Sequence, residues 1–484
     1  MLEIATIVLT VGAMLYHVFG VSIGVTGVVS SLLVLIAAIV FRTRRGMMLG
    51  AVMGGVLLLG WVAMWQADRS IDQRIYGKRA FDARVVSVNR QLDKVSIVVV
   101  DEEYGERLQV SVRGSLAVLP GDHLGVRGEV EVPEDFETGT GRIFAYQAFM
   151  ESKGIVGIAS SAIVGPVMSH SFSLNRFPTI VRYAFADVFA RYVSFPFDGV
   201  LAGMTVGYQG GLPDYISDLF RNTGVLHVLV LSGYNITLLA GALAVVLKGL
   251  PFRMRNIVTI IAILMLVLVS GSGVAAVRAG IMGSIAVFAG LSIRTYQPMR
   301  ALIISYIIFF FMSPTSVFVD PGFHLSFLAT MFMILVLPKV ELLFKWIPQT
   351  DHIDLRELIM LAVSAPVFML PYMMYFSGNF PLSSPFANIL FAIITPIIMI
   401  SGIILFALSW ITPVATLLGT LISWVGNLSL KFLELCSHIY IWNTPPISWW
   451  SVTLVYVAVI YLLFKRDISE YVLQQYRAFR RQTN

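Results

Sequence analysis

Long apolar runs occupy most of the chain, and one polar, alternating stretch interrupts them. Three apolar segments come first, at about 4–20, 25–41 and 47–66. Nine more candidate spans follow the interruption, at about 225–248, 256–271, 273–293, 299–317, 323–338, 356–376, 384–409, 411–427 and 448–465. Most are close to the length of about 20 apolar residues that a transmembrane helix needs. The pattern therefore predicts a polytopic α-helical membrane protein of about twelve spans.

Residues 77–165 have a different pattern, in which apolar and polar positions alternate. Five short strands are predicted, in "FDARVVSVNR", "KVSIVVVDEE", "RLQVSVRG", "DHLGVRGEVEV" and "GIVGIASSAIV". A helix is predicted over 142–152, before the last strand. Five strands and one helix suit a small closed barrel of the oligonucleotide/oligosaccharide-binding (OB) kind.

Two further regions are apolar but broken by polar residues. Over 176–221 the breaks include Arg182, Asp187 and Asp214, which predicts amphipathic helices at the membrane–water boundary. Segment 428–447 contains Lys431 and Glu434 together with paired prolines. We therefore expect that segment to lie on the outer surface, with its Trp and Tyr side chains among the lipid headgroups.

Composition and charge support a membrane protein and predict its topology. The chain is 57% hydrophobic and 13% charged, with a mean hydropathy of +0.81, whereas soluble domains are about 25% charged. Basic clusters at 42–45, 248–255, 294–300 and 339–345, and in the tail from 465, all fall on one side of a twelve-span scheme. The positive-inside rule makes that side cytoplasmic. It places both termini in the cytoplasm and the barrel outside. The chain's one cysteine allows no internal disulfide.

The predicted domains follow from these patterns. They are 1–67 (three N-terminal transmembrane helices), 77–165 (OB-like domain), 176–221 (interfacial helices), 222–465 (transmembrane domain) and 466–484 (basic cytoplasmic tail).

The segment "NTGVLHVLVLSGYNITLLAG" (222–241) concentrates polar groups within a predicted span. It carries His227, Ser232, Tyr234 and Asn235. On one helix Asn235 lies about 80° from His227 and about 60° from Ser232, so a polar face is centred near Asn235. Gly233 lies on the opposite side, where a neighbouring backbone could approach closely. Buried polar groups of this kind either hold helices together or line a wet cavity, and their concentration favours the cavity.

Three other stretches place polar residues in the apolar region. Arg278 lies among small residues in "SGSGVAAVRAGIM", where a cation costs at least about 2.5 kcal/mol unless it snorkels or meets an anion. "DPGFHLSFLAT" opens a helix at Asp320 and carries His324 and Ser326. "GNFPLSSPFANILFAIITP" breaks at its prolines and serines. It brings Ser384 and Asn388 toward the membrane, which is tolerated where backbone is buried in protein or lines water.

Sequence motifs leave three classes of function open. There is no phosphate-binding loop, dinucleotide-binding glycine motif or HExxH zinc motif, and we expect no metal and no cofactor. Broken helices favour a transport pathway, so a channel is the first class. A transporter of a small anion is the second. The third is an intramembrane serine hydrolase, in which Ser232 would be activated by His227 or, from another helix, His324.

The four polar stretches, in this order and spacing, resemble the ComEC family of bacterial competence membrane proteins. "GTGRIFAYQAFMESKGI" is similar to the end of that family's OB-like domain. The resemblance covers nearly all of residues 30–465. It implies a multi-helix channel that passes one strand of incoming DNA into the cytoplasm, with no catalytic residues in the channel itself. Family-typical positions include His227, Ser232, Arg278, Ser326 and Asn388.

The resemblance also implies partners. They are single-stranded DNA, an extracytoplasmic DNA receptor, a cytoplasmic helicase-type ATPase and a separate nuclease. The family's usual second His is Asn235 here, which can form hydrogen bonds but cannot titrate. Many members carry a C-terminal nuclease domain with an HxHxDH metal motif, and no HxH occurs in this sequence. We therefore expect no built-in nuclease.

The charge of the OB-like domain does not match a simple DNA groove. Residues 77–165 hold 10 Lys and Arg against 13 Asp and Glu, a net charge of −3, whereas grooves for single strands are basic and aromatic. The domain therefore either has a structural role, covering the channel mouth or joining two copies, or carries a basic patch that the average hides.

Overall fold

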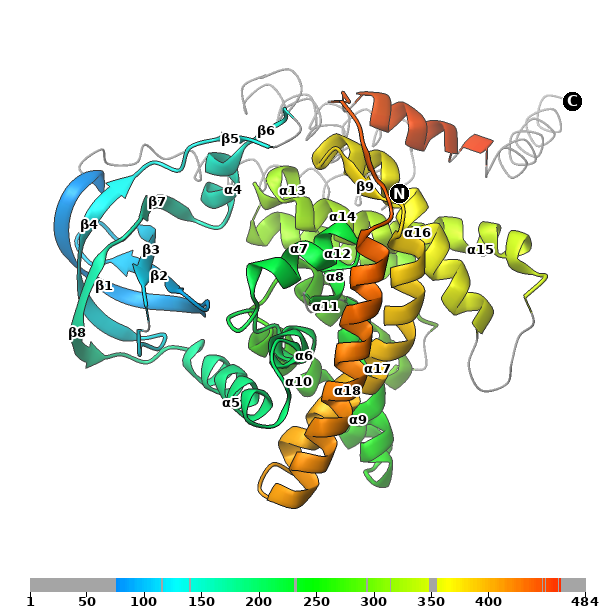
Figure 1. The fold of residues 1–484 in the computed structure, drawn as a ribbon, viewed down its shortest axis with the longest axis horizontal. Coiled ribbons are helices and arrows are strands. Elements are labelled where there is room, and N and C mark those ends of the chain that lie inside the picture. Colours follow the sequence, from blue (N-terminus) through cyan, green and yellow to red (C-terminus); the bar gives the residue numbers. More distant parts are fainter. Residues whose placement is uncertain are drawn as a thin grey trace, which may run out of the picture.

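The structure is a computed structural model. It describes residues 75–462 except 115, 139–140, 230–232, 293–294, 314, 348–354, 446, 449 and 460. The predicted spans at 4–20, 25–41 and 47–66 and the basic tail lie outside the described residues. A β-barrel occupies one side of the molecule and a body of helices the other, with α5 (Arg176–Tyr192) leading from the barrel into the helices (Figure 1).

The barrel is closed and has five strands, as predicted. They are β1 (Gly77–Arg90), β2 (Lys94–Asp101), β3 (Arg107–Arg113), β4 (Asp122–Glu131) and β7 (Ile155–Ala159). Their order is β1-β2-β3-β7-β4, and β4 pairs with β1 to close the sheet. The alternation seen in the sequence has a direct cause, because every second side chain points inward. Val95, Ile97 and Val99 of β2 are almost completely buried, and the residues between them are not.

Two local predictions in the barrel were wrong. The last predicted strand is two strands, because a turn at Ser161 (φ 60°) separates β7 from β8 (Ile163–His170), which adds to the outside of β4. The predicted helix over 142–152 begins only at Tyr146 (α4, Tyr146–Ser152). Ile143 and Phe144 instead form β6, which pairs with β5 (Phe136–Glu137) in a short arm outside the barrel.

Six helices in the described part of the chain are long and apolar enough to cross a membrane, so membrane helices are confirmed and twelve spans are not shown. They are α10 (Phe252–Val269), α11 (Val274–Leu291), α14 to α15 (Pro321–Val340), α16 (Leu355–Phe376), α17 (Ser384–Ala407) and α18 (Thr412–Ser437). Helix α14 ends at Met331 and continues through a π-helical turn, Phe332–Val336. Helices α9 (Gly233–Val246) and α12 (Pro298–Met312) are shorter, and Trp450–Val459 is a short apolar helix.

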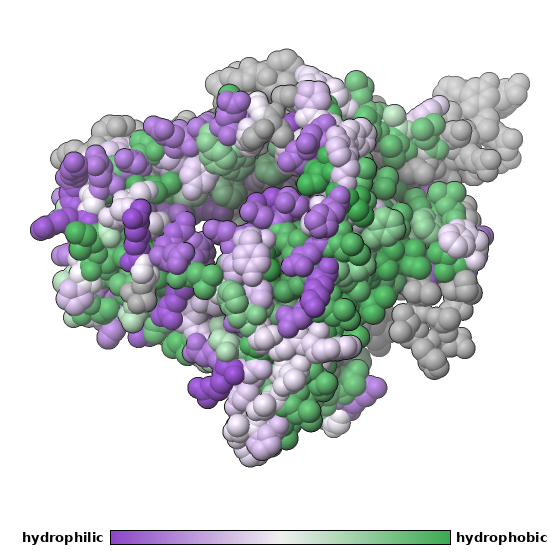
Figure 2. All heavy atoms as spheres, viewed as in Figure 1, coloured by the Kyte–Doolittle hydropathy of each residue, from purple (hydrophilic) through white to green (hydrophobic). Residues whose placement is uncertain are grey.

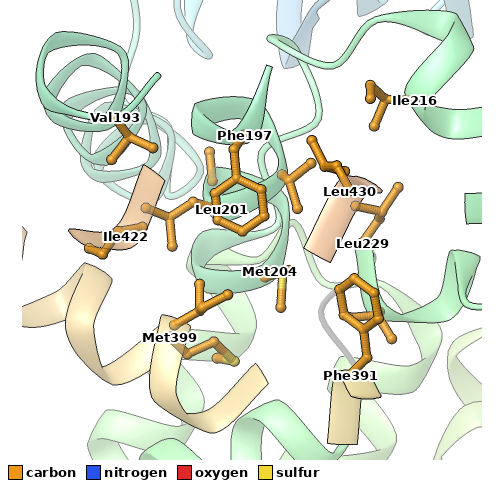
Figure 3. Close-up of a cluster of buried hydrophobic side chains, with 14 of the residues drawn as sticks. Val193, Phe197, Leu201, Met204, Ile216, Leu229, Phe391, Met399, Ile422 and Leu430 are labelled. Carbon is orange, nitrogen blue, oxygen red and sulfur yellow. The ribbon is translucent and has the colours of Figure 1, made fainter. Parts of the chain in front are cut away.

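Helix α6 (Phe197–Val206) corrects the prediction of interfacial helices over 176–221. All its residues except Asp198 are buried. Its glycines allow close packing: a Cβ atom on Gly203 would lie 2.9 Å from the carbonyl oxygen of Leu229. Figure 3 shows side chains of α6 packed between Met399 of α17 and residues of α18. Helix α7 (Asp214–Asn222) is amphipathic, as expected, with Ile216 and Phe220 buried.

Helix α18 corrects a second prediction. It runs without a break from Thr412 to Ser437, so residues 428–437 belong to a long helix and not to a surface segment. One face of the helix supplies the reason, since Ser429, Leu430, Leu433 and Cys436 are all buried. Lys431 and Glu434 lie on the exposed face, where their charge costs little.

The arm and the end of α4 contact one set of helix ends. The carbonyl of Ser152 accepts hydrogen bonds from Ser313 and Ser316, next to α13 (Ser316–Val319). Arg142 of the arm reaches the carbonyls of Met374, near the end of α16, and Pro445. The predicted topology places these same ends on the barrel's side of the membrane.

Candidate functional site

Three of the polar stretches meet at Arg278, in the second turn of α11. The guanidinium donates from Nη1 to the carbonyl oxygen of Ser326 on α14, at 2.7 Å. A Cβ atom at Gly233 of α9 would lie 2.8 Å from Nη2, so a larger residue there would displace the guanidinium. A close approach at Gly233 was expected from a neighbouring backbone, but the atoms that approach it are side-chain atoms of Arg278 and Ala279 on α11.

Arg278 is a buried cation with unused hydrogen-bonding capacity. Its side chain is 9% exposed. Within the described residues it has no carboxylate partner, and its Nε–H and the hydroxyl of Ser326 have no hydrogen-bond partner. An unpaired charge in the interior is costly. Guanidinium groups bind carboxylates and phosphates strongly, so an anion that reached this pair of groups would find hydrogen-bond donors on both.

A second group forms where α17 begins. Gly224 has a positive φ of 75°, and a Cβ atom there would lie 2.6 Å from Oγ of Ser384. Asn388, one turn along α17, donates from Nδ2 to the carbonyl and hydroxyl oxygens of Ser384, at 2.8 and 3.0 Å. The stretch at 222–241 therefore contacts the broken helix start that the sequence singled out.

His227 lies in α8 (Leu226–Leu229), next to this second group. Its side chain is exposed, although Val228 and Leu229 beside it are buried. The next described helix, α9, begins at Gly233, and Ser232 lies among residues 230–232, outside the described part. The side chain of Tyr234 is likewise not described. The proposed Ser232 dyad therefore stays a prediction.

Asn235 has a different environment from His227. It is 1% exposed, and its Nδ2 donates to the carbonyl oxygen of Met204 at 3.3 Å. The bond joins α9 to the buried helix α6. Asn235 thus holds two helices together in this structure, whereas the sequence pattern favoured a place at the centre of a cavity-facing polar surface.

Asp320 and His324 shape the start of α14. Asp320 is the N-cap, as its charge and position suggested, and its carboxylate accepts from the backbone N–H of Gly322 at 2.8 Å. Nε2 of His324 donates to the carbonyl of Val317 at 2.9 Å, since a carbonyl only accepts, and Nδ1 contacts the hydroxyl of Tyr372 at 2.8 Å. Both ring nitrogens of His324 are therefore engaged with these neighbours.

A pocket of about 280 Å³ on the barrel was not predicted. It opens on the outward faces of β2 and β3, beside α4, where its lining includes Lys94, Ser96, Gln109, Ser111 and Lys153. Burial lowers the pKa of Lys153, and the charge of Asp320 opposes that shift. The net charge of −3 concealed this patch, because strand alternation places these side chains together while the acids lie elsewhere. The sequence did contain a signal for this patch: in each predicted strand every second residue points outward, and most of the outward residues of β2 and β3 are polar or basic.

The described residues contain no cluster of three or more His, Cys, Asp or Glu side chains that could hold a metal ion. The polar side chains described above form one group at Arg278 and a second at the start of α17, with His227 next to the second. They comprise one buried cation together with amides, hydroxyls and imidazoles, and a guanidinium is a group to which an anion can bond.

Comparison with known proteins gives the family. ComE operon protein 3 of Bacillus subtilis (strain 168) is 23% identical over 281 residues, which is 56% of this chain and 35% of that protein. The alignment thus spans about a third of that relative's length. No solved structure matches the chain. The sequence profile of the competence proteins matches residues 204–467, more than half of the 484 residues and all of the region around Arg278. The chain is a member of the competence protein family.

Proposed function

We propose that this protein is a channel that passes single-stranded DNA across the bacterial cytoplasmic membrane during natural transformation. Membership of the competence family implies a role in DNA uptake. One observation carries the channel mechanism: Arg278 is a buried guanidinium with no carboxylate partner in the described residues, beside an unbonded Ser326 hydroxyl. It can bind one phosphate of a passing strand.

The sparse charge of this region agrees with transport of a polyanion. A strand carries one negative charge per nucleotide, and a dense row of cations would hold it too tightly to move. Conduction requires sites that bind well enough to admit the substrate and weakly enough to release it. One buried arginine, with the neutral donors of Ser326 and His227, meets that requirement better than a basic stripe.

The barrel supplies the approach to this region in our proposal. Figure 2 shows a recess between the barrel and the helices, with hydrophilic residues at its margin. Lys94 and Lys153 of the barrel pocket offer positive charge, and its serines and glutamine offer hydrogen bonds. These side chains suit a phosphate–sugar backbone, which is recognised by charge and hydrogen bonds without reading of bases.

The proposed partners follow from what a passive channel needs. Directed movement requires an ATPase on the cytoplasmic side, and the sequence contains no phosphate-binding loop of its own. A DNA receptor outside the membrane and a separate nuclease would supply the strand. Membrane lipids surround the apolar helices.

Replacement of Arg278 tests the function. In a competent bacterium that lacks its own channel, Arg278→Ala should lower cytoplasmic uptake of labelled DNA about tenfold or more, because a hydrogen bond to a charged group contributes about 1.5 kcal/mol or more. DNA bound at the cell surface should be unchanged. Arg278→Lys keeps a charge but loses the fork geometry, so we expect an intermediate value.

Two controls make the result specific. Arg221→Ala removes an exposed arginine whose one ion pair within the described part of the chain is with Asp218 on its own helix, and should leave uptake unchanged. The apparent unfolding temperature of Arg278→Ala should not fall, because the change removes an uncompensated buried charge. Normal uptake by Arg278→Ala, at normal protein levels in the membrane, would refute the role of Arg278.

A further inference from the structure

Arg142 links three segments that are far apart in the sequence. It lies at the base of the short arm formed by β5 and β6, where the backbone N–H of Thr138 donates to its carbonyl. Its side chain is 9% exposed. From Nη2 it donates to the carbonyl of Met374 and, at 2.9 Å, to the carbonyl of Pro445.

Both acceptors lie at chain ends that need a partner. Met374 is in the last turn of α16, where backbone carbonyls have no partner within the helix. A cation at a helix C-terminus is also favoured by the helix dipole. Pro445 follows β10 (Ile441–Asn443), which comes directly after α18 and pairs with β9 (Asn379–Pro381), directly after α16. One guanidinium therefore bonds to both chain segments that leave the helical body here.

Other contacts of the arm, of α4 and of the barrel also attach the barrel to the helices. Phe144, two residues after Arg142, packs edge-on against Phe376, with ring centroids 5.9 Å apart. Farther along, the carbonyl of Ser152 accepts from Ser313 and Ser316. On the other side of the barrel, the guanidinium of Arg90 lies 4.0 Å from the centre of the Tyr183 ring on α5.

We propose that Arg142 is a positioning residue that holds the barrel over the ends of the helices, so that the barrel pocket and Arg278 lie on one path for the strand. This role rests on the proposed function. Arginine suits it because the two N–H bonds of its Nη2 lie in the fixed plane of the guanidinium and point at both carbonyls, while a lysine ammonium sits on a flexible stem. The DNA itself does not touch Arg142.

Distance measurement tests the docking directly. Spin labels would be placed at Ile143 and Glu434, both exposed, by cysteine substitution in a Cys436→Ala background. The full-length protein in detergent should give one narrow distance distribution. Arg142→Ala should broaden it, because each bond lost from a charged group raises the undocked fraction about tenfold. Arg142→Lys should be intermediate, and Arg221→Ala should match the parent.

DNA uptake by the same variants tests the positioning role. We expect Arg142→Ala to lower cytoplasmic uptake about tenfold, with normal surface binding, and Arg142→Lys to recover part of it. If Arg142→Ala misfolds, the size-exclusion profile will show it. The distance and uptake measurements are then made on Arg142→Lys, which keeps the charge and the bulk of the side chain.

The failures of the two proposals are distinguishable. An unchanged distance distribution in Arg142→Ala overturns the docking role, whatever uptake does. A broadened distribution with normal uptake, while Arg278→Ala is defective, overturns positioning and leaves the channel intact. If Arg278→Ala also takes up DNA normally, the proposed function is refuted, and Arg142 keeps only its docking contact.

Discussion

At the scale of single residues, the polar groups of the apolar region divide into those already bonded and those with capacity left. Asn235, Asn388 and His324 all donate to or accept from neighbours. Arg278 Nε and Ser326 Oγ do not, among the described residues. Unbonded buried polar groups are costly, and under the proposed function we expect a transported anion to bond to these two.

Asp320 offers a test that separates capping from charge. Its carboxylate caps α14 by accepting from Gly322. Asp320→Ala should destabilise the start of α14 by about 1 kcal/mol, while Asp320→Asn should cost much less, since Asn is an equally good N-cap. Hydrogen exchange of the backbone N–H groups at 322–324 would measure both. Equal exchange rates in the two variants would contradict the capping role.

At the scale of elements, the described helices pack through small residues. Gly419 and Gly426 of α18 lie against Tyr192 and Phe197, and Gly402 of α17 lies against Leu201. Each approach is too close for a side chain. This packing places α6 in the interior, where an amphipathic surface helix was expected, since its own glycines also admit neighbours.

The matched pair Gly419→Ala and Gly241→Ala tests this packing. A Cβ atom at Gly419 meets the backbone of Tyr192, which cannot move aside as a flexible side chain could, whereas Gly241 has open space around it. Gly419→Ala should therefore lower stability by about 1–3 kcal/mol. Gly241→Ala should be neutral or slightly stabilising, because alanine favours a helix. Apparent unfolding temperatures in detergent would compare them, and equal values would contradict the packing.

At the scale of the whole molecule, the barrel is tied to the helices at separate junctions. Arg142 forms one. Asp122 forms another: it is 3% exposed, accepts from Leu119 N–H at 2.9 Å and lies 2.7 Å from both Arg176, at the start of α5, and His170. Burial acts to raise the pKa of Asp122, but these hydrogen bonds and the Arg176 charge hold it below its usual value.

The lowered pKa predicts an acid-sensitive junction. A carboxylate whose pKa is lower in the folded than in the unfolded protein stabilises the folded state at every pH above its unfolded-state pKa. That stabilisation is lost as the pH falls through the folded-state pKa. We expect the stability of the junction to fall below about pH 4. Asp122→Asn should be less stable than the parent at pH 7, and the difference should shrink in acid. Unfolding followed from pH 7 to pH 3 would measure this, and a constant difference would contradict it.

Much of the fold could be predicted from the sequence because its signals are local. Apolar runs indicated α10, α11, α14, α16 and α17, and alternation indicated the closed barrel. The failures came where neighbours decide the outcome. The charges of Lys431 and Glu434 argued for a surface segment at 428–437, and the burial of Leu430 and Leu433 in the continuing helix outweighed them. In the barrel, the turn at Ser161 divided one apolar run into two strands.

The sequence by itself determined that this is a membrane protein with a small inserted barrel and four polar stretches of the competence type. Hydropathy and alternation report how each residue interacts with its solvent, and that can be read one residue at a time. Only the tertiary structure decided which polar groups are bonded and which remain open. Asn235 is bonded through Met204, 31 positions away, and Arg278 meets Ser326, 48 positions away. Hydrogen-bond partners this distant are set by how helices pack, which no local pattern contains.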